Sequence, residues 1–199
     1  MNFVDCHDSI LEQKSKKLTR EEILLPSTQE FFKHMLSFAA GEQADRQGSI
    51  LVGLAAPQIG KLWRVIIVDV KADGKGHTAQ LKLYINPKIT YFSKESEEWY
   101  EGCYSTAKIR GVVERPKEIV VEALDHNGNE LTETHQGYVA RIFQHEIDHL
   151  DGIRFPQRMD KNESLHLVEP DEVFRYRNLE EWKDWHRCFP QPQWKERMK

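Results

Sequence analysis

The chain has 199 residues, of which 39% are hydrophobic and 30% charged, and a formal net charge of -4. This length favours one domain with a hydrophobic core, and the weak acidity gives no sign of a nucleic-acid or membrane-surface binder. No stretch approaches the ~18–20 apolar residues of a membrane span, and the N-terminus does not resemble a secretory signal. Three scattered cysteines make a disulfide framework unexpected. We therefore expect a cytoplasmic protein.

The N-terminal half predicts one helix and two strands. Apolar side chains at helical spacing predict a helix over residues 28–40, and the polar, glycine-containing stretch that follows predicts a loop over residues 41–49. The β-branched run RVIIVDV predicts a strand over residues 64–70. A second strand is expected over residues 81–85, stopped by Asn86-Pro87.

The second half begins with a hairpin. Two strand-like segments, residues 118–124 and 130–134, flank Asn127-Gly128, which accepts the positive φ angles of a tight turn. A helix is then expected over residues 137–150, GYVARIFQHEIDHL, with Gly152 just past its end.

The C-terminal residues predict a peripheral helix over residues 171–189, a charged stretch that also holds Phe174, Trp182 and Trp185. The order of helix, strands, hairpin and helix predicts a single α+β domain over residues 1–199. Its mixed or antiparallel sheets would pack around the core helix, with a peripheral tail from about residue 162.

That core helix carries the pattern H-E-x-x-H as His145, Glu146 and His149. Residues four apart on a helix lie one above the other, so both imidazoles can bind one metal ion. Glu146 lies about 100° around the helix, flanks that ion and can take a proton from a water there. A chance pair of surface histidines is the plain alternative. Apolar neighbours such as Ile147 and Leu150 weigh against it, because a core helix rarely buries such groups without partners.

A catalytic metal commonly has three protein ligands, and the sequence offers two candidates for the third. Cys103 follows Gly102, which permits close backbone approach, and a thiolate is a good ligand for Fe(II), Co(II), Ni(II) or Zn(II). Glu169 lies twenty residues past His149, close to the spacing of one class of zinc peptidases. Pro170 follows it and disfavours the helix that such a ligand needs. The residues favour Cys103 and leave Glu169 open.

A third segment, GLAAPQIG at residues 53–60, comes just before the first expected strand. Its small residues and proline suggest a loop pressed closely against another part of the protein, and Gln58 offers an amide donor. Taken alone, it is more typical of an ordinary apolar turn entering a strand.

Together the three segments resemble the signature motifs of the peptide deformylase family, G-x-G-L-A-A-P-Q, E-G-C-L-S and Q-H-E-x-D-H. They stand here as residues 51–58, 101–105 and 144–149, in the family's order. The resemblance extends from about Asp8 to about Met159. Three ordered motifs are far more specific than any one of them.

The resemblance implies a metal-dependent hydrolase that removes the formyl group from the N-terminal formyl-methionine of newly made proteins. The implied metal ligands are Cys103, His145 and His149, and Glu146 would be the general acid and base. Gln58 and the backbone N–H of Tyr104 would face the developing oxyanion. The residues that the resemblance places against the substrate are Gly53, Val52, Tyr138 and Ile142.

The implied ion is one divalent metal, usually Fe(II), with Zn(II), Ni(II) or Co(II) able to substitute. The implied partners are nascent N-formyl-Met peptides, so we expect action near the ribosome, without direct nucleic-acid contact and without a membrane. The extended substrate would lie along a sheet edge.

Three residues depart from the family's pattern. Leu51 replaces the first glycine of the first motif, Tyr104 replaces a leucine, and Arg141 stands where many bacterial members have an apolar residue. Residues 110–115 and 140–142 resemble the subgroup that includes organellar deformylases. Two other functions stay open at this point. One is a zinc endopeptidase that uses Glu169, and the other is a non-catalytic module that binds protein N-termini.

Overall fold

The computed structural model describes residues 2–45, 51–74, 80–160, 163–177, 182 and 184–198. Its helices are α1 (Arg20–Leu24), α2 (Pro26–Asp45), α3 (Gly137–Leu150) and α4 (Val173–Tyr176). Its strands are β1 (Gly53–Ala55), β2 (Val65–Asp69), β3 (Leu81–Phe92), β4 (Ser96–Gly102), β5 (Ile109–Pro116), β6 (Glu118–Leu124), β7 (Glu130–Gln136), β8 (Ser164–Leu167) and β9 (Cys188–Pro190). No helix among these residues is long and apolar enough to cross a membrane.

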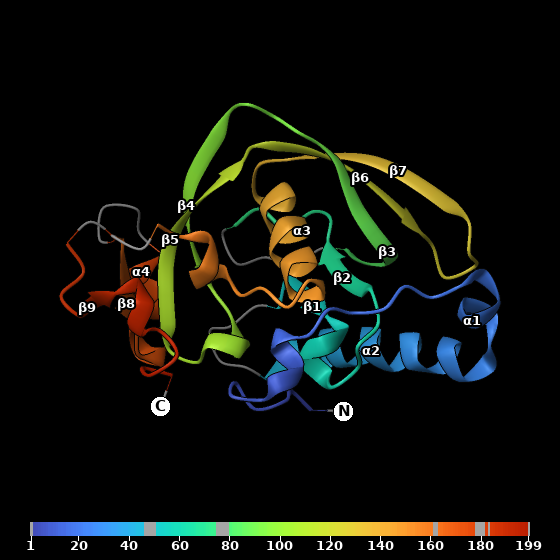
Figure 1. Cartoon of the computed structure of the whole chain (residues 1–199), viewed down its shortest axis with the longest axis horizontal. Coiled ribbons are helices and arrows are strands. Elements are labelled where there is room, and N and C mark those ends of the chain that lie inside the picture. The colour runs from blue at the N-terminus through green and yellow to red at the C-terminus, as the bar shows by residue number, and fades with distance from the viewer. Residues whose placement is uncertain are drawn as a thin grey trace.

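Two antiparallel sheets flank the central helix α3 (Figure 1). One has the strand order β1-β2-β3-β6-β7 and arches over the helix, and the other has the order β4-β5-β8-β9. The expected hairpin is β6–β7, with Gly128 at a φ of 80° in its turn. The expected α+β class is therefore confirmed, and α3 has the bounds that its sequence pattern predicts.

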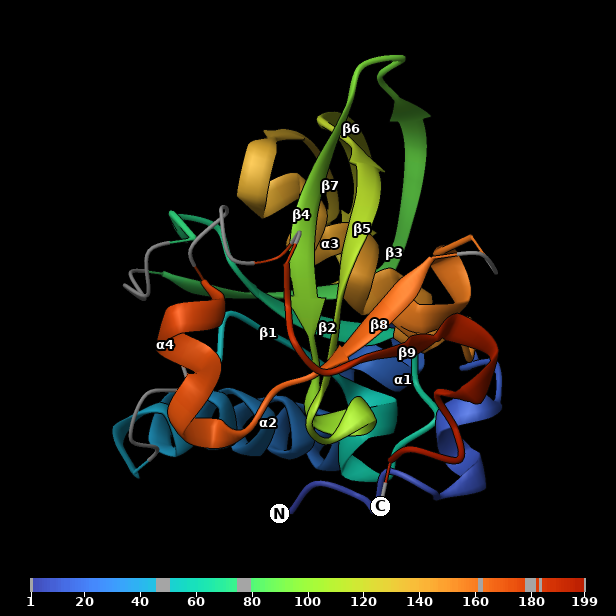
Figure 2. The same ribbon diagram turned by 90° about the vertical axis from the view of Figure 1, so that its left-hand side faces the viewer.

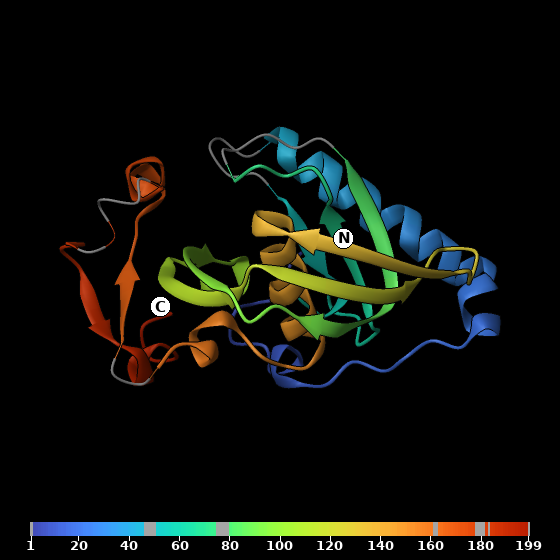
Figure 3. The same ribbon diagram turned by 90° about the horizontal axis from the view of Figure 1, so that it is seen from above.

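The strand β2 is buried on both faces and ties the two largest parts of the core together. Ile66 and Val68 pack with α3, whereas Val65 and Ile67 on the opposite face pack with α2. This follows from the alternation of side chains along a strand. Figure 3 shows α2 lying along the outer side of this sheet.

The strand expected over residues 81–85 does not stop at Asn86-Pro87, so that expected end is wrong: β3 continues to Phe92. The pairing of β3 with β6 shifts register between Ile85 and Lys88, and Asn86 adopts a φ of 52° there. A proline is tolerated where a bulge removes the need for its missing N–H. The Asn86 amide also pairs with the backbone of Leu18, at 2.9 Å to its N and 2.7 Å to its O.

The expected loop over residues 41–49 is also wrong in its first part, because α2 continues to Asp45. Gly41 is exposed on the helix surface, where a glycine weakens a helix without ending it. Residues 46–50 lie outside the described part of the chain.

The peripheral helix expected over residues 171–189 is wrong for the residues that the structure describes. Among these residues, only the 3-10 turn Pro170–Glu172 and the short α-helix Val173–Tyr176 are helical, and Cys188–Pro190 forms β9 beside β8 (Figure 2). Trp182 and Trp185 are buried with Val168 and Tyr176 in a cluster against β4. A patch of aromatic side chains thus gains more by packing on a sheet than by forming an isolated helix.

Candidate active site

Helix α3 brings together the three residues of the H-E-x-x-H pattern. His145 and His149 lie one turn apart, with ring centroids 5.0 Å from each other. His149 and Glu146 are buried, at 1% and 5% exposure, and the helix ends at Leu150, two residues before Gly152 with its φ of 72°. Both imidazoles and the carboxylate are therefore held by the most buried helix of the fold.

The end of β4 places Cys103 against this helix. Its Sγ lies 3.2 Å from Nε2 of His149, and one ligand atom from each of Cys103, His145 and His149 lies within 4.8 Å of the others. Burial alone would raise the pKa of the Cys103 thiol, but the neighbouring imidazoles, His149 first, hold that pKa well below its ordinary value. The thiolate is the form that binds a metal.

The buried carboxylate of Glu101 orients His145 from behind. It accepts hydrogen bonds from Nδ1 of His145 at 2.8 Å, from Arg141 at 2.8 Å, and from Arg115 at 2.6 and 3.0 Å. Burial would raise the pKa of Glu101, yet Arg115 and His145 hold it well below its ordinary value. With Nδ1 engaged, His145 offers Nε2 to an ion, as metal-bound histidines generally do.

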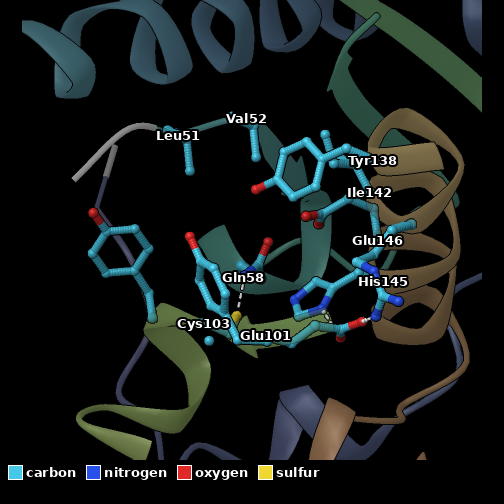
Figure 4. A pocket seen from close by; sticks show the side chains of 14 residues that line it. Leu51, Val52, Gln58, Glu101, Cys103, Tyr138, Ile142, His145 and Glu146 are labelled. Atoms are coloured by element: carbon cyan, nitrogen blue, oxygen red, sulfur yellow. Dashed lines mark hydrogen bonds and ion pairs between the residues drawn. The ribbon is translucent and has the colours of Figure 1, made fainter. Parts of the chain in front are cut away.

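Gln58 lies in the short 3-10 helix after β1 and points its amide at Cys103 (Figure 4). Its Oε1 accepts the N–H of Ala55 at 2.7 Å, which fixes the amide orientation. Its Nε2 therefore lies 3.2 Å from the Cys103 sulfur and 3.4 Å from the Ser105 hydroxyl. A fixed N–H donor beside the candidate ligands is the arrangement that stabilises a developing oxyanion.

Glu146 faces the pocket next to Gly53 on β1. Burial raises the pKa of Glu146 to about 7, a value suited to a group that both accepts and donates a proton near neutral pH. A Cβ added at Gly53 would lie 2.3 Å from Oε1 of Glu146 and 2.8 Å from Ile142. Any larger residue at position 53 would therefore force this carboxylate and Ile142 to shift.

One pocket joins these groups to the residues that the sequence places against a substrate (Figure 4). Val52, Gly53, Tyr138 and Ile142 all line it, as do Gln58, Cys103, His145 and Glu146. Leu51, Tyr100, Glu101, Gly102, Tyr104 and Arg141 complete its wall. Tyr104 begins the short 3-10 helix Tyr104–Thr106 that follows Cys103.

The structure brings every predicted site residue to this pocket or its edge, except the alternative ligand Glu169. The Glu169 carboxylate is paired with Lys108 at 2.6 Å and with Arg187 at 3.7 Å. The sequence interpretation missed the roles of Glu101 and Arg115. The signal for Glu101 was its place inside the second motif, two residues before the candidate ligand Cys103.

The residues present fit a metal ion. Within the described part of the chain, Oε2 of Glu146 is buried without a hydrogen-bond partner. Buried polar atoms normally have partners, so this unpaired oxygen indicates that a further group belongs in the site. A thiolate with two imidazoles is a donor set suited to Fe(II), Co(II), Ni(II) or Zn(II), with a coordination position left for water or substrate.

A core helix bearing paired histidines and a free carboxylate beside an open pocket is the architecture of a metal-dependent hydrolase. Comparisons with known proteins narrow this class. The sequence profile described as polypeptide deformylase matches residues 1–164. The peptide deformylase of Natranaerobius thermophilus is 37% identical over 154 residues, 77% of this chain and 88% of that protein. That of Treponema pallidum is 40% identical over 129 residues, 65% of this chain and 75% of the relative. The chain therefore belongs to the polypeptide deformylase family.

Solved structures agree with this membership. A peptide deformylase from Ehrlichia chaffeensis in complex with actinonin superposes with a TM-score of 0.69 at 32% identity, covering 81% of this chain and 89% of that one. A class I type b peptide deformylase from Acinetobacter baumannii bound to Met-Ala-Ser has a TM-score of 0.69 at 30% identity, covering 80% and 98%.

Proposed function

We propose that this chain hydrolyses the formyl amide of N-formyl-Met peptides to formate and a free Met-peptide, with the site residues assigned as follows. The observation that carries the proposal is the convergence of Cys103, His145 and His149 beside the unpartnered, buried carboxylate of Glu146. The family to which the chain belongs supports the same reaction.

Cys103, His145 and His149 would hold one divalent ion. When bound, such an ion lowers the pKa of a water molecule and polarises the formyl carbonyl. Iron(II) is the proposed native ion, with zinc, nickel or cobalt as substitutes, because the donor set of one thiolate and two imidazoles accepts each of them. Glu101 keeps the ring of His145 in the orientation that this ligand role needs.

Glu146 moves the proton in the proposed mechanism. Its carboxylate accepts a proton from the attacking water and then gives it to the amine that leaves as the amide bond breaks. Gln58 Nε2 and the backbone N–H of Tyr104 donate to the oxyanion of the tetrahedral species, a contribution of about 3–4 kcal/mol per donor in comparable sites. Gln58 needs no reorganisation for this, because the Ala55 N–H already fixes its amide.

The substrate would lie extended between two sheet edges. Both β1 and β4 are terminal strands of their sheets, and residues of both line the pocket. An extended peptide can add to such an edge through main-chain hydrogen bonds. The methionine side chain would enter the part of the pocket lined by Val52, Tyr138 and Ile142, and Gly53 leaves room beside the reacting group.

Nascent formylated chains are the proposed partners, which places the proposed site of action in the cytoplasm near the ribosome. The relative bound to Met-Ala-Ser supports a peptide ligand of this class. Glu169, the ligand needed by the endopeptidase alternative, is held in ion pairs with Lys108 and Arg187 instead.

The test of the proposed function is the substitution Glu146→Gln, which keeps the side-chain shape and removes the base. Formate release from formyl-Met-Ala-Ser should fall by about 10²–10⁴-fold, the usual contribution of general acid–base catalysis. The variant should keep its metal and its affinity for Met-Ala-Ser. Turnover within a few-fold of the unmodified protein at full metal content would show that Glu146 is not the base. Loss of the metal would assign Glu146 a ligand or structural role.

A further inference from the structure

The chain beyond the matched family region is packed against the pocket. The family profile ends at residue 164, and β8 begins there and pairs with β5 through Ile109↔Leu167 and Arg110↔His166. The Trp185 indole N–H donates to the Leu167 carbonyl at 2.9 Å. The part of the chain that follows residue 164, called the C-terminal segment below, is thus anchored to the sheet that also contains β4, and β4 leads into Cys103.

Tyr100 connects this segment to the pocket. It lines the pocket, and its ring also meets Trp182 and Tyr176 edge-on, with centroids 5.3 and 5.7 Å away. Trp182 and Tyr176 are almost fully buried, at 6% and 1% exposure. Such edge-to-face pairs fix ring orientation, so the C-terminal segment determines where the Tyr100 ring stands in the pocket wall.

Arg110 carries a positive charge close to the same ring. It pairs with Gly102 in the β4–β5 register, and Gly102 shares the face of β4 that carries Tyr100. A Cβ on Gly102 would meet the Arg110 side chain. Burial raises the pKa of the Tyr100 phenol, and the guanidinium groups of Arg177 and Arg110 oppose that rise. The wall at Tyr100 therefore combines an aromatic ring with nearby positive charge.

The alternation of side chains indicates which substrate residue meets this wall. On β4, Glu101 points to His145, so its neighbour Tyr100 points to the opposite face of the strand. Successive side chains of an extended substrate alternate in the same way. If the first side chain enters the pocket at Tyr138 and Ile142, the second points to the face that carries Tyr100.

We propose that the C-terminal segment is a specificity element: Tyr176 and Trp182 hold Tyr100 as an aromatic wall that selects a flat apolar side chain at the second residue of the substrate and disfavours a cationic one. This deepens the proposed deformylase function and rests on it.

The test compares three substrates that differ only at the second residue: formyl-Met-Phe-Ser, formyl-Met-Ala-Ser and formyl-Met-Lys-Ser. The metal-loaded full chain should prefer phenylalanine over alanine by about tenfold in kcat/KM, the effect of one good aromatic pair. Lysine should be the poorest. In Trp182→Ala and in Tyr100→Ala the phenylalanine preference should fall to near one through a rise in KM for that substrate. Tyr100→Phe, which keeps the ring, should keep the preference.

Phe174→Ala is the matched control, because Phe174 is an aromatic residue of the same segment that is 88% exposed. It should leave all three kcat/KM values unchanged. Dissociation constants of Met-Phe-Ser and Met-Ala-Ser, measured on the same proteins, separate this inference from the proposed function. If these dissociation constants show the predicted preference for Met-Phe-Ser but no formate is released, the proposed function is refuted and this inference stands. No preference in the unmodified chain, or the same preference in Tyr100→Ala, would overturn the inference.

Discussion

Replacement of Gly53 by alanine tests the closest contact in the site. Gly53 lies in β1 with a φ outside the left-handed region, so alanine strains no backbone angle there. The effect must come from the added Cβ, which would stand 2.3 Å from Oε1 of Glu146 and 2.8 Å from its Cδ and from Cγ2 of Ile142. Ordinary contact begins at 3.4 Å.

The clash requires the Glu146 carboxylate to retreat by about 1 Å. A displacement of that size in a catalytic group lowers a rate by about 10²-fold, so kcat for formyl-Met-Ala-Ser should fall by about this factor. Overpacking should also lower the free energy of unfolding by about 1–3 kcal/mol. Metal content should stay at one ion per chain, because no ligand atom is among the atoms that the Cβ meets.

The assay is formate release at saturating substrate, with metal analysis and a denaturant melt on the same preparations. Gly41→Ala is the control: a Cβ there meets no atom within 4 Å, and alanine stabilises a helix by about 1 kcal/mol relative to glycine. It should raise stability and leave kcat unchanged. A Gly53→Ala protein with full kcat would refute the reasoning, because Glu146 would then tolerate the displacement. Loss of metal would place the displaced group among the ligands.

Three further predictions follow from the ligand set and from a buried histidine. Cys103→Ala should lose the ion, whereas Glu169→Ala should retain it, because Lys108 pairs with the Glu169 carboxylate. Metal analysis after gel filtration measures this, and a Cys103→Ala chain that keeps one tightly bound ion contradicts the ligand assignment. The iron-loaded protein should lose formate-releasing activity in air while nickel- and cobalt-loaded protein persists, and equal decay of all three would count against a redox-active native ion. Burial lowers the pKa of His166 to about 4, below its ordinary value of 6.5. The unfolded chain therefore binds more protons between these values, and as the pH falls through this window the free energy of unfolding should drop by up to about 3 kcal/mol. Denaturant melts at pH 7 and 4.5 should show a smaller drop for His166→Gln, and an equal drop in both proteins would show that another group titrates.

The elements that local pattern predicts well are those whose hydrophobic period is unbroken. The helix at residues 137–150 and the hairpin around Asn127-Gly128 have the predicted bounds or lie within two residues of them. The prediction ends the strand at Asn86-Pro87 too early, because a bulge admits a proline that a regular ladder excludes. The predicted C-terminal helix does not form among the described residues, because its tryptophans are buried against a strand far away in the sequence, β4.

By itself, the sequence determined the reaction chemistry that this protein can support. The spacing of His145 and His149 on a helix lets one metal ion bind both imidazoles, with the acid Glu146 beside it. A thiol such as that of Cys103 suits the same ion. Helix geometry and ligand chemistry are both local properties. Only the tertiary structure decided that Cys103 rather than Glu169 meets the histidines, and that Glu101, held by Arg115 and Arg141, orients one of them. These contacts join residues far apart in the chain through strand register and helix rotation, which a local pattern does not encode.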